Sequence, residues 1–179
     1  RGLLTRRRGV GTLVSPPHVH RPMELTSLLS DLTDAGHHVS TSITRYEMRA
    51  ATQEEAKALG VDEGEVVAHI ERIRYADDEP IAILTNLLPA DITPAMQELE
   101  NGSLYELMRR RDVVLTSAHQ VIGARTASSK EARLLNESRG AAVLTARRTT
   151  YDPSGRVVEY GDHIYRASRY SFETTLFSN

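Results

Sequence analysis

Two arginines stand two residues apart in a stretch that is typical of a β-hairpin, residues 66–89. Apolar, β-branched runs flank a polar turn there, as in two paired strands. Alternate side chains of a strand share a face, so Arg72 and Arg74 are predicted to point the same way among apolar neighbours. Guanidinium groups in such surroundings are costly to desolvate unless an anion meets them. The pair is therefore either an anion-binding fork or a pair of salt-bridge partners for local carboxylates such as Glu71 and Glu79.

A serine and a tyrosine stand at the predicted start of a later helix, at Ser103 and Tyr105. Free backbone N–H groups and the positive end of the helix dipole favour an anion at such a place. Ser103 and Glu106 also match a capping box, which requires no ligand. Both interpretations stay open on the residues alone.

Four residues share one face of a late strand: Glu159, Gly161, His163 and Tyr165. A carboxylate, an imidazole and a phenol around a glycine would suit a polyhydroxylated ligand. The alternative is the exposed polar face of a half-buried strand, which antiparallel sheets commonly have.

Motifs of hydrolytic and redox enzymes are missing from the sequence. It has no Gly-x-Ser-x-Gly elbow, no His-Glu-x-x-His, no phosphate loop and no dinucleotide fingerprint. The absence of cysteine excludes a thiol nucleophile and a thiolate metal site. We predict no cofactor and no metal. A small-molecule enzyme, with His119 or His163 and Glu159 as acid–base groups, remains the alternative to a binding protein.

The chain length, the net charge and the length of the apolar runs limit the class of protein. A chain of 179 residues fits one domain, or one domain and the remnant of another. A net charge of −2 gives the whole chain no electrostatic reason to bind nucleic acid or an anionic membrane. No apolar run reaches membrane-spanning length, and these features fit a cytoplasmic protein.

The order of predicted elements is helix, strand, helix, hairpin, and then the same series again. Consecutive hairpins indicate an antiparallel β-sheet with flanking helices, an α+β fold built from two similar halves. The predicted helices cover residues 25–35, 52–59, 103–111 and 128–136, and the strands cover residues 39–49, 66–76, 81–88, 113–124, 141–151, 156–165 and 169–176.

The beginning of the chain is basic. Residues 6–14 place three arginines beside two glycines and a short β-prone run. Such a segment either contacts phosphates or forms a solvated tail. Two prolines within residues 15–18 then predict a linker.

Several motifs, taken in order, resemble those of GntR-type bacterial transcription regulators of the HutC subfamily. They are Arg-x-Arg-x-x-Asp-x-x-Pro at residues 72–80, Ser-Leu-Tyr at 103–105, Ala-Arg-Arg-x-x-Tyr-Asp at 146–152, Val-Val-Glu-Tyr-Gly-Asp-His-Ile-Tyr-Arg at 157–166 and Ser-Arg-Tyr-Ser-Phe at 168–172. Each motif is weak alone, but together they span most of the chain.

The resemblance implies a chorismate lyase-like (UTRA) fold without lyase activity. Residues 1–15 would be the remnant of the wing of a winged helix-turn-helix domain, residues 16–19 a linker and residues 20–179 the UTRA effector-binding domain. The implied partners are a small-molecule effector, a second copy in a homodimer, and operator DNA reached through an N-terminal domain mostly absent from this sequence. No membrane partner is implied.

The resemblance also implies the site residues. In relatives that sense amino-sugar phosphates, an Arg-x-Arg pair and a Ser-x-Tyr pair hold the phosphate, and a glutamate and a tyrosine of a late strand hold the sugar. The matching residues here are Arg72, Arg74, Ser103, Tyr105, Glu159 and Tyr165. The implied effector is a small anionic metabolite. One departure is Leu84, where many relatives carry a glutamate, and it leaves the effector's identity open.

Overall fold

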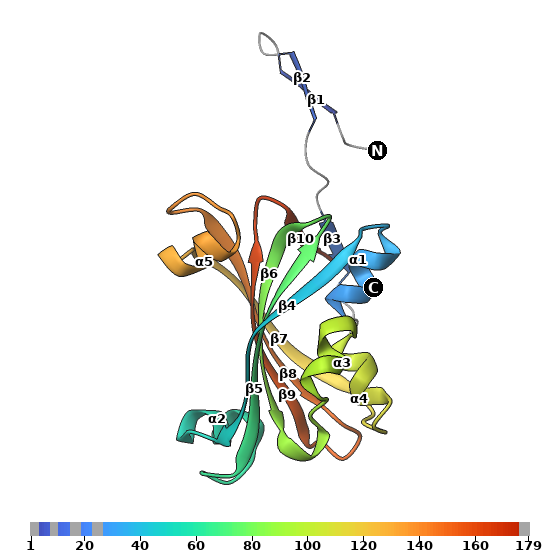
Figure 1. Cartoon of the computed structure of the whole chain (residues 1–179), viewed down its shortest axis with the longest axis vertical. Coiled ribbons are helices and arrows are strands. Elements are labelled where there is room, and N and C mark those ends of the chain that lie inside the picture. Colours follow the sequence, from blue (N-terminus) through green and yellow to red (C-terminus); the bar gives the residue numbers. More distant parts are fainter. Residues whose placement is uncertain (1–3, 8–10, 15–18, 23–26, 176–179) are drawn as a thin grey trace, which may run out of the picture.

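The computed structural model describes residues 4–7, 11–14, 19–22 and 27–175. Within these residues, six strands form one antiparallel sheet in the order β4-β5-β6-β9-β8-β7 (Figure 1). The strands are β4 (Val39–Ala50), β5 (Val66–Ala76), β6 (Glu79–Pro89), β7 (Ser117–Thr126), β8 (Ala142–Tyr151) and β9 (Val157–Arg166). The predicted α+β fold with an antiparallel sheet and flanking helices is confirmed.

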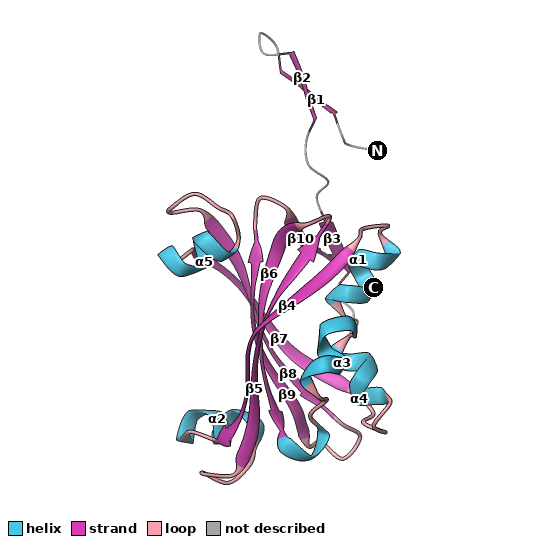
Figure 2. Cartoon of the chain, in the orientation of Figure 1, coloured by secondary structure: helices cyan, strands magenta, loops and turns pink. Residues whose placement is uncertain are grey.

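Short helices cover both faces of the sheet (Figure 2). One face carries α1 (Leu28–Asp34), α3 (Met96–Asn101) and α4 (Leu104–Arg109), and the other carries α2 (Gln53–Leu59) and α5 (Ser129–Leu134); a 3-10 helix, η1 (Ala90–Ile92), follows β6. The largest apolar cluster lies between the sheet and the pair α3 and α4, where Leu99 and Met108 are fully buried. This packing fixes the position of α4 against the sheet.

The sheet consists of two matching halves that meet where β6 pairs with β9. Helices α2 and α5 occupy equivalent places in the two halves. Each begins with a capping box, and the glutamate of that box accepts hydrogen bonds from an arginine of the preceding strand. Arg49 donates to both oxygens of Glu55 at 2.7 and 2.6 Å, and Arg125 donates to both oxygens of Glu131 at 2.7 and 2.8 Å. The predicted repetition is therefore present in the structure.

Two predicted boundaries are wrong. Strand β7 begins at Ser117 and not at Val113. Val113 is buried in the apolar cluster beneath α4, and Asp112 before it has a φ of +60°, so this segment packs against α4 before the strand starts. The predicted last strand is shorter, as β10 (Tyr170–Glu173), and residue 176 lies outside the described residues.

The predicted hairpin turn between β5 and β6 has a primed form. Asp77 and Asp78 have φ values of 51° and 64°, in the left-handed region that such a turn requires. The Asp77 carboxylate accepts a hydrogen bond from the His38 N–H at 3.0 Å and lies 2.7 Å from His37 Nδ1. These contacts fix the turn and with it the register of the strands that carry both arginines.

Two further pairings lie outside the main sheet. β1 (Leu4–Arg7) and β2 (Gly11–Val14) form an antiparallel hairpin, and β3 (Val19–Pro22) runs parallel to β10. The parallel pair was not predicted, and it includes Val19 of the expected linker. Residues 8–10 of the basic segment and residues 16–18 of the linker lie outside the described residues. Among the helices that the structure describes, none has the length and apolar character needed to cross a membrane.

Candidate functional site

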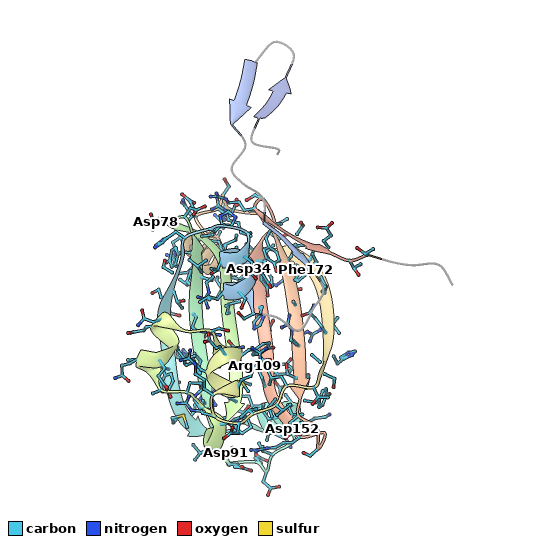
Figure 3. All side chains as sticks on the ribbon, turned by 90° about the vertical axis from the view of Figure 1, so that its right-hand side faces the viewer. Asp34, Asp78, Asp91, Arg109, Asp152 and Phe172 are labelled. Carbon is cyan, nitrogen blue, oxygen red and sulfur yellow. The ribbon has the colours of Figure 1, made fainter. Side chains whose placement is uncertain are left out.

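A cavity that opens to solvent lies between the sheet and the helices α1 and α4. Figure 3 looks onto the helices that cover it. Its walls come from β5 and β6 of the first half and from β8 and β9 of the second. All six residues predicted from the sequence line this cavity: Arg72, Arg74, Ser103, Tyr105, Glu159 and Tyr165.

Both hairpin arginines are buried, with 3% of Arg72 and 2% of Arg74 exposed. Arg72 Nη2 donates to Asn86 Oδ1 at 2.7 Å, and Arg74 Nη1 donates to Thr41 Oγ1. Nε and Nη1 of Arg72 and Nε of Arg74 have no hydrogen-bond partner in the part of the chain that the structure describes. Buried donors of this kind are normally satisfied, so these three point to a group that the protein itself does not supply.

The salt-bridge interpretation of the two arginines is wrong. Glu71 faces Arg45 at 3.9 Å, and Glu79 pairs with Arg166 at 2.9 Å. Among residues 27–175, no carboxylate forms an ion pair with Arg72 or Arg74.

Burial changes the acid–base properties of this pair. Desolvation lowers the pKa of Arg72 to about 10, and desolvation together with the charge of Arg72 lowers the pKa of Arg74 to about 9. Both values lie above neutral pH, so two neighbouring guanidinium groups are cationic inside the protein.

The Glu159 side chain is fully buried on the same cavity wall, so the interpretation of its strand as an exposed polar face is wrong. Its Oε1 accepts from Asn86 Nδ2 at 2.5 Å, and its Oε2 accepts from Tyr105 Oη at 2.8 Å and from Thr150 Oγ1 at 2.7 Å. Residues from β6, α4 and β8 thus hold one carboxylate in a single orientation.

Asn86 connects the arginine to the imidazole. Because its Oδ1 accepts from Arg72, its Nδ2 is the donor toward His163 Nε2 at 3.2 Å. The ring proton of a neutral His163 therefore lies on Nδ1, which is 3.3 Å from Tyr165 Oη. The network fixes the orientations of Asn86, Glu159 and His163.

Gly161 leaves the space in which this network fits. A Cβ atom at this position would lie 2.7 Å from His163 Nε2 and 2.9 Å from Glu159 Oε1. Glycine is needed here for room between two functional side chains.

The capping box predicted at Ser103 is wrong, because its side chain makes no capping hydrogen bond with α4. The residue is buried, and it lines the cavity instead. Tyr105, two residues further, donates its hydroxyl hydrogen to Glu159 and also accepts from Arg148 Nη1 at 3.1 Å. Burial raises the pKa of Tyr105, so its hydroxyl stays protonated and donates.

The sequence interpretation missed three residues of the network, Asn86, Arg148 and Thr150. Asn86 is a polar residue in an otherwise apolar strand, and Arg148 stands in the Ala-Arg-Arg motif, so each carried a visible signal. Leu84, the departure from the relatives, is buried and forms part of the apolar wall of the cavity.

Of the two histidines that were candidates for acid–base chemistry, only one lies in the cavity wall. His163 lines the cavity, with Nε2 at 4.0 Å from Glu159 Oε1. His119 is an exposed residue of β7 and is not part of the cavity wall.

The sequence profile of the UTRA domain matches residues 34–171. The chain belongs to the UTRA family. This UTRA chain is 32% identical over 174 residues to the HTH-type transcriptional repressor NagR of Bacillus subtilis, covering 96% of this chain and 72% of that protein. It is 31% identical over 176 residues to the histidine utilization repressor of Pseudomonas putida, covering 96% and 70%.

Solved structures support the assignment to the UTRA family. The crystal structure of PhnF from Mycobacterium smegmatis matches with a TM-score of 0.89 and 26% identity, over 99% of this chain and 80% of that one. The resemblance to GntR-type regulators of the HutC subfamily is confirmed. This chain is a UTRA domain of GntR-family transcriptional repressors, the module through which an effector regulates them.

Proposed function

We propose that this UTRA domain binds a small anionic metabolite in the cavity at the seam of its two halves, and that an amino-sugar phosphate is the class that suits the lining best. The observation that carries the proposal is the set of unsatisfied, buried N–H groups of Arg72 and Arg74 on the cavity wall.

The charge of the cavity favours a phosphate. Three guanidinium groups, from Arg72, Arg74 and Arg148, face one carboxylate, from Glu159. An unpaired buried ion costs several kcal/mol, and an anionic ligand offsets this cost by pairing with it. Phosphate oxygens accept from guanidinium forks in a bidentate manner. The Ser103 hydroxyl supplies a further donor.

The part of the lining around Glu159 suits the hydroxyl groups of a sugar. Glu159 accepts hydrogen bonds in a fixed orientation, and Tyr165 with His163 offers polar atoms beside it. Leu84 provides an apolar surface for ring C–H groups. Tyr105 acts on the effector partly through Glu159, because its hydroxyl holds that carboxylate.

Regulation follows if the effector prefers one arrangement of the protein over another, since operator affinity then depends on its concentration. Residues 1–15 would be the end of a winged helix-turn-helix domain, residues 16–19 a linker and residues 20–179 the sensing domain. The β1–β2 hairpin supports this division. The proposed regulator is a homodimer that reaches operator DNA through its N-terminal domain, and it is not an enzyme.

Calorimetry with glucosamine 6-phosphate, glucosamine and inorganic phosphate tests the proposal. We expect the sugar phosphate to bind and to raise the melting temperature, and glucosamine, which lacks the phosphate, to do neither. Arg72→Met and Arg74→Met should each weaken binding by about 2–5 kcal/mol, at least about 30-fold. The ligand-free variants should melt at or above the wild-type temperature, because each loses a buried, unpaired charge.

Arg166→Met is the matched control. Arg166 is also well buried, but it pairs with Glu137 at 2.6 Å and with Glu79 at 2.9 Å. This variant should lose stability and keep its affinity. Unchanged affinity in both hairpin variants would overturn the phosphate fork, and conversion of a bound ligand to product would favour the enzyme alternative.

A further inference from the structure

A second cavity borders the first one on the side of β4. Arg74 and Leu29 line both cavities, so the two share a wall. The rest of the second cavity's lining comes from residues 38–43, at and just before the start of β4, and from Glu100 and Asn101 of α3. Helices α1 and α3 lie beside β4 in this region (Figure 1).

The register of the strands places the arginine pair between the two cavities. Ala82 of β6 pairs with Tyr165 of β9 on one side and with Arg74 of β5 on the other. Arg74 in turn pairs with Thr41 of β4. Directly opposed residues of neighbouring strands point to the same face of a sheet. One row of side chains therefore runs from Tyr165 in the first cavity, through Arg74, to Thr41 in the second.

Arg74 lies at the junction of the two cavities. Its side chain is buried, its Nη1 donates to Thr41 Oγ1, and its Nε has no hydrogen-bond partner among the described residues. Buried donors are normally satisfied, so an anion is expected at this arginine. A phosphate held there would have a cavity on each of its two sides, because Arg74 lines both.

The lining of the second cavity suits hydroxyl groups better than a further phosphate. The hydroxyl groups of Thr41 and Ser42, the amide of Asn101 and the carboxylate of Glu100 supply both donors and acceptors. Among the described residues that line this cavity, Arg74 is the one arginine, and the first phosphate already engages it. The charge of Glu100 would repel a second anion.

We propose that the second cavity is a subsite for a group attached to the far side of the phosphate, so that the preferred effector is a phosphodiester. An amino sugar would occupy the first cavity, and a small hydroxylated group, for which glycerol is the simplest probe, would occupy the second. The inference rests on the proposed function, because it requires Arg72 and Arg74 to hold the phosphate. A diester keeps two anionic oxygens for these guanidinium groups.

Calorimetry with three probes tests the subsite. They are glucosamine 6-phosphate, its methyl phosphodiester and its glycerol phosphodiester. The two diesters carry the same charge, so a difference between them reports the hydroxylated group alone. We expect the glycerol diester to bind about 10-fold more tightly than the methyl diester, as two additional hydrogen bonds would give.

Asn101→Trp places a large ring at the wall of the second cavity. Asn101 is an exposed residue at the end of α3, and it does not line the first cavity. We expect this variant to remove the advantage of the glycerol diester and to keep the wild-type affinity for glucosamine 6-phosphate, which also shows that it is folded. Gln97→Trp is the matched control. Gln97 is an exposed amide of the same helix that lines neither cavity, so all three affinities should match wild type.

The outcomes separate the two proposals. Equal affinities of the two diesters for the wild-type chain would overturn the subsite and leave the proposed function intact. An advantage of the glycerol diester that survives Asn101→Trp would contradict its placement in the second cavity. Equal weakening of all three probes by Asn101→Trp would identify the cavity as an entrance and not a subsite. Failure of all three to bind the wild-type chain would overturn the proposed function, and the subsite with it.

Discussion

Gly161 separates the two side chains that the proposed sugar site needs most. Its missing side chain leaves room for His163 Nε2 and Glu159 Oε1, and an added methyl group would lie under 3.0 Å from both. We expect Gly161→Ala to displace one of them, to break the contacts with Asn86 and to cost about 1–3 kcal/mol of stability. Affinity for glucosamine 6-phosphate, measured by calorimetry, should fall at least about 10-fold, since the displaced group faces the cavity.

Gly123→Ala is the control for that change. Gly123 is also a strand residue with limited space, its added Cβ lying 3.0 Å from Thr145 Oγ1, but it is not part of the cavity wall. Its affinity should equal that of wild type. If Gly161→Ala also kept full affinity, the fixed orientation of Glu159 and His163 would have no role in binding.

The cavity-lining residues that the sequence identified were those that follow from a local rule or from the family resemblance. Strand alternation places Arg72 with Arg74, and it needs no knowledge of the fold. Asn86 joins the site through the pairing of β6 with β9, and Arg148 joins it through its contact with Tyr105 of α4. Both connect elements distant in sequence, which spacing does not specify. Ser103 shows the converse, because the Ser-x-x-Glu pattern is local and takes no account of burial.

Among the elements, α2 and α5 offer a matched pair of capping devices. The Arg49 fork, together with the Thr52 N–H, lowers the pKa of Glu55 from 4.5 to about 2. A depressed carboxyl pKa contributes stability that is complete above the unfolded value and is lost as the pH falls through the folded one. Glu55→Gln should therefore cost about 1 kcal/mol at pH 7. The difference from wild type should disappear as the pH approaches 2.

Denaturant melts at several pH values measure this effect. Glu131→Gln, at the equivalent place in the second half, should behave alike, because its fork from Arg125 lowers its pKa to about 2 as well. Glu54→Gln is the control, since Glu54 lies in the same turn of α2 and is exposed. A cost for Glu55→Gln that did not change between pH 7 and pH 2 would show that packing and not charge stabilises the cap.

The elements themselves were predictable where periodicity and caps are local. Helix starts at Thr52 and Ser128 and the hairpin turn at Asp77 follow from a few neighbouring residues. The delayed start of β7 depends on Val113 packing beneath α4, and the β3–β10 pair joins opposite ends of the chain. Neither carries a local signal, so neither could be derived from the sequence.

For the whole molecule, the repeated order of elements has a consequence for how the chain could be divided. A cut between Asn101 and Gly102 would leave β4, β5 and β6 in one fragment and β7, β8 and β9 in the other. The first fragment would keep Arg72, Arg74 and Asn86, and the second would keep Glu159 with Tyr105 and Thr150, which donate to it. The two hairpin arginines and the carboxylate of Glu159 would then be on separate polypeptides.

Such fragments should reassemble, and the effector should act as the link between them. A ligand that binds only the assembled form stabilises it by about 2.7 kcal/mol at 100 times its dissociation constant, which tightens fragment association about 100-fold. Fragment titration with and without glucosamine 6-phosphate measures this gain, and equal association in both would contradict it. The chain then corresponds to two complementary fragments joined in one polypeptide. The metabolite would bind where these two parts meet.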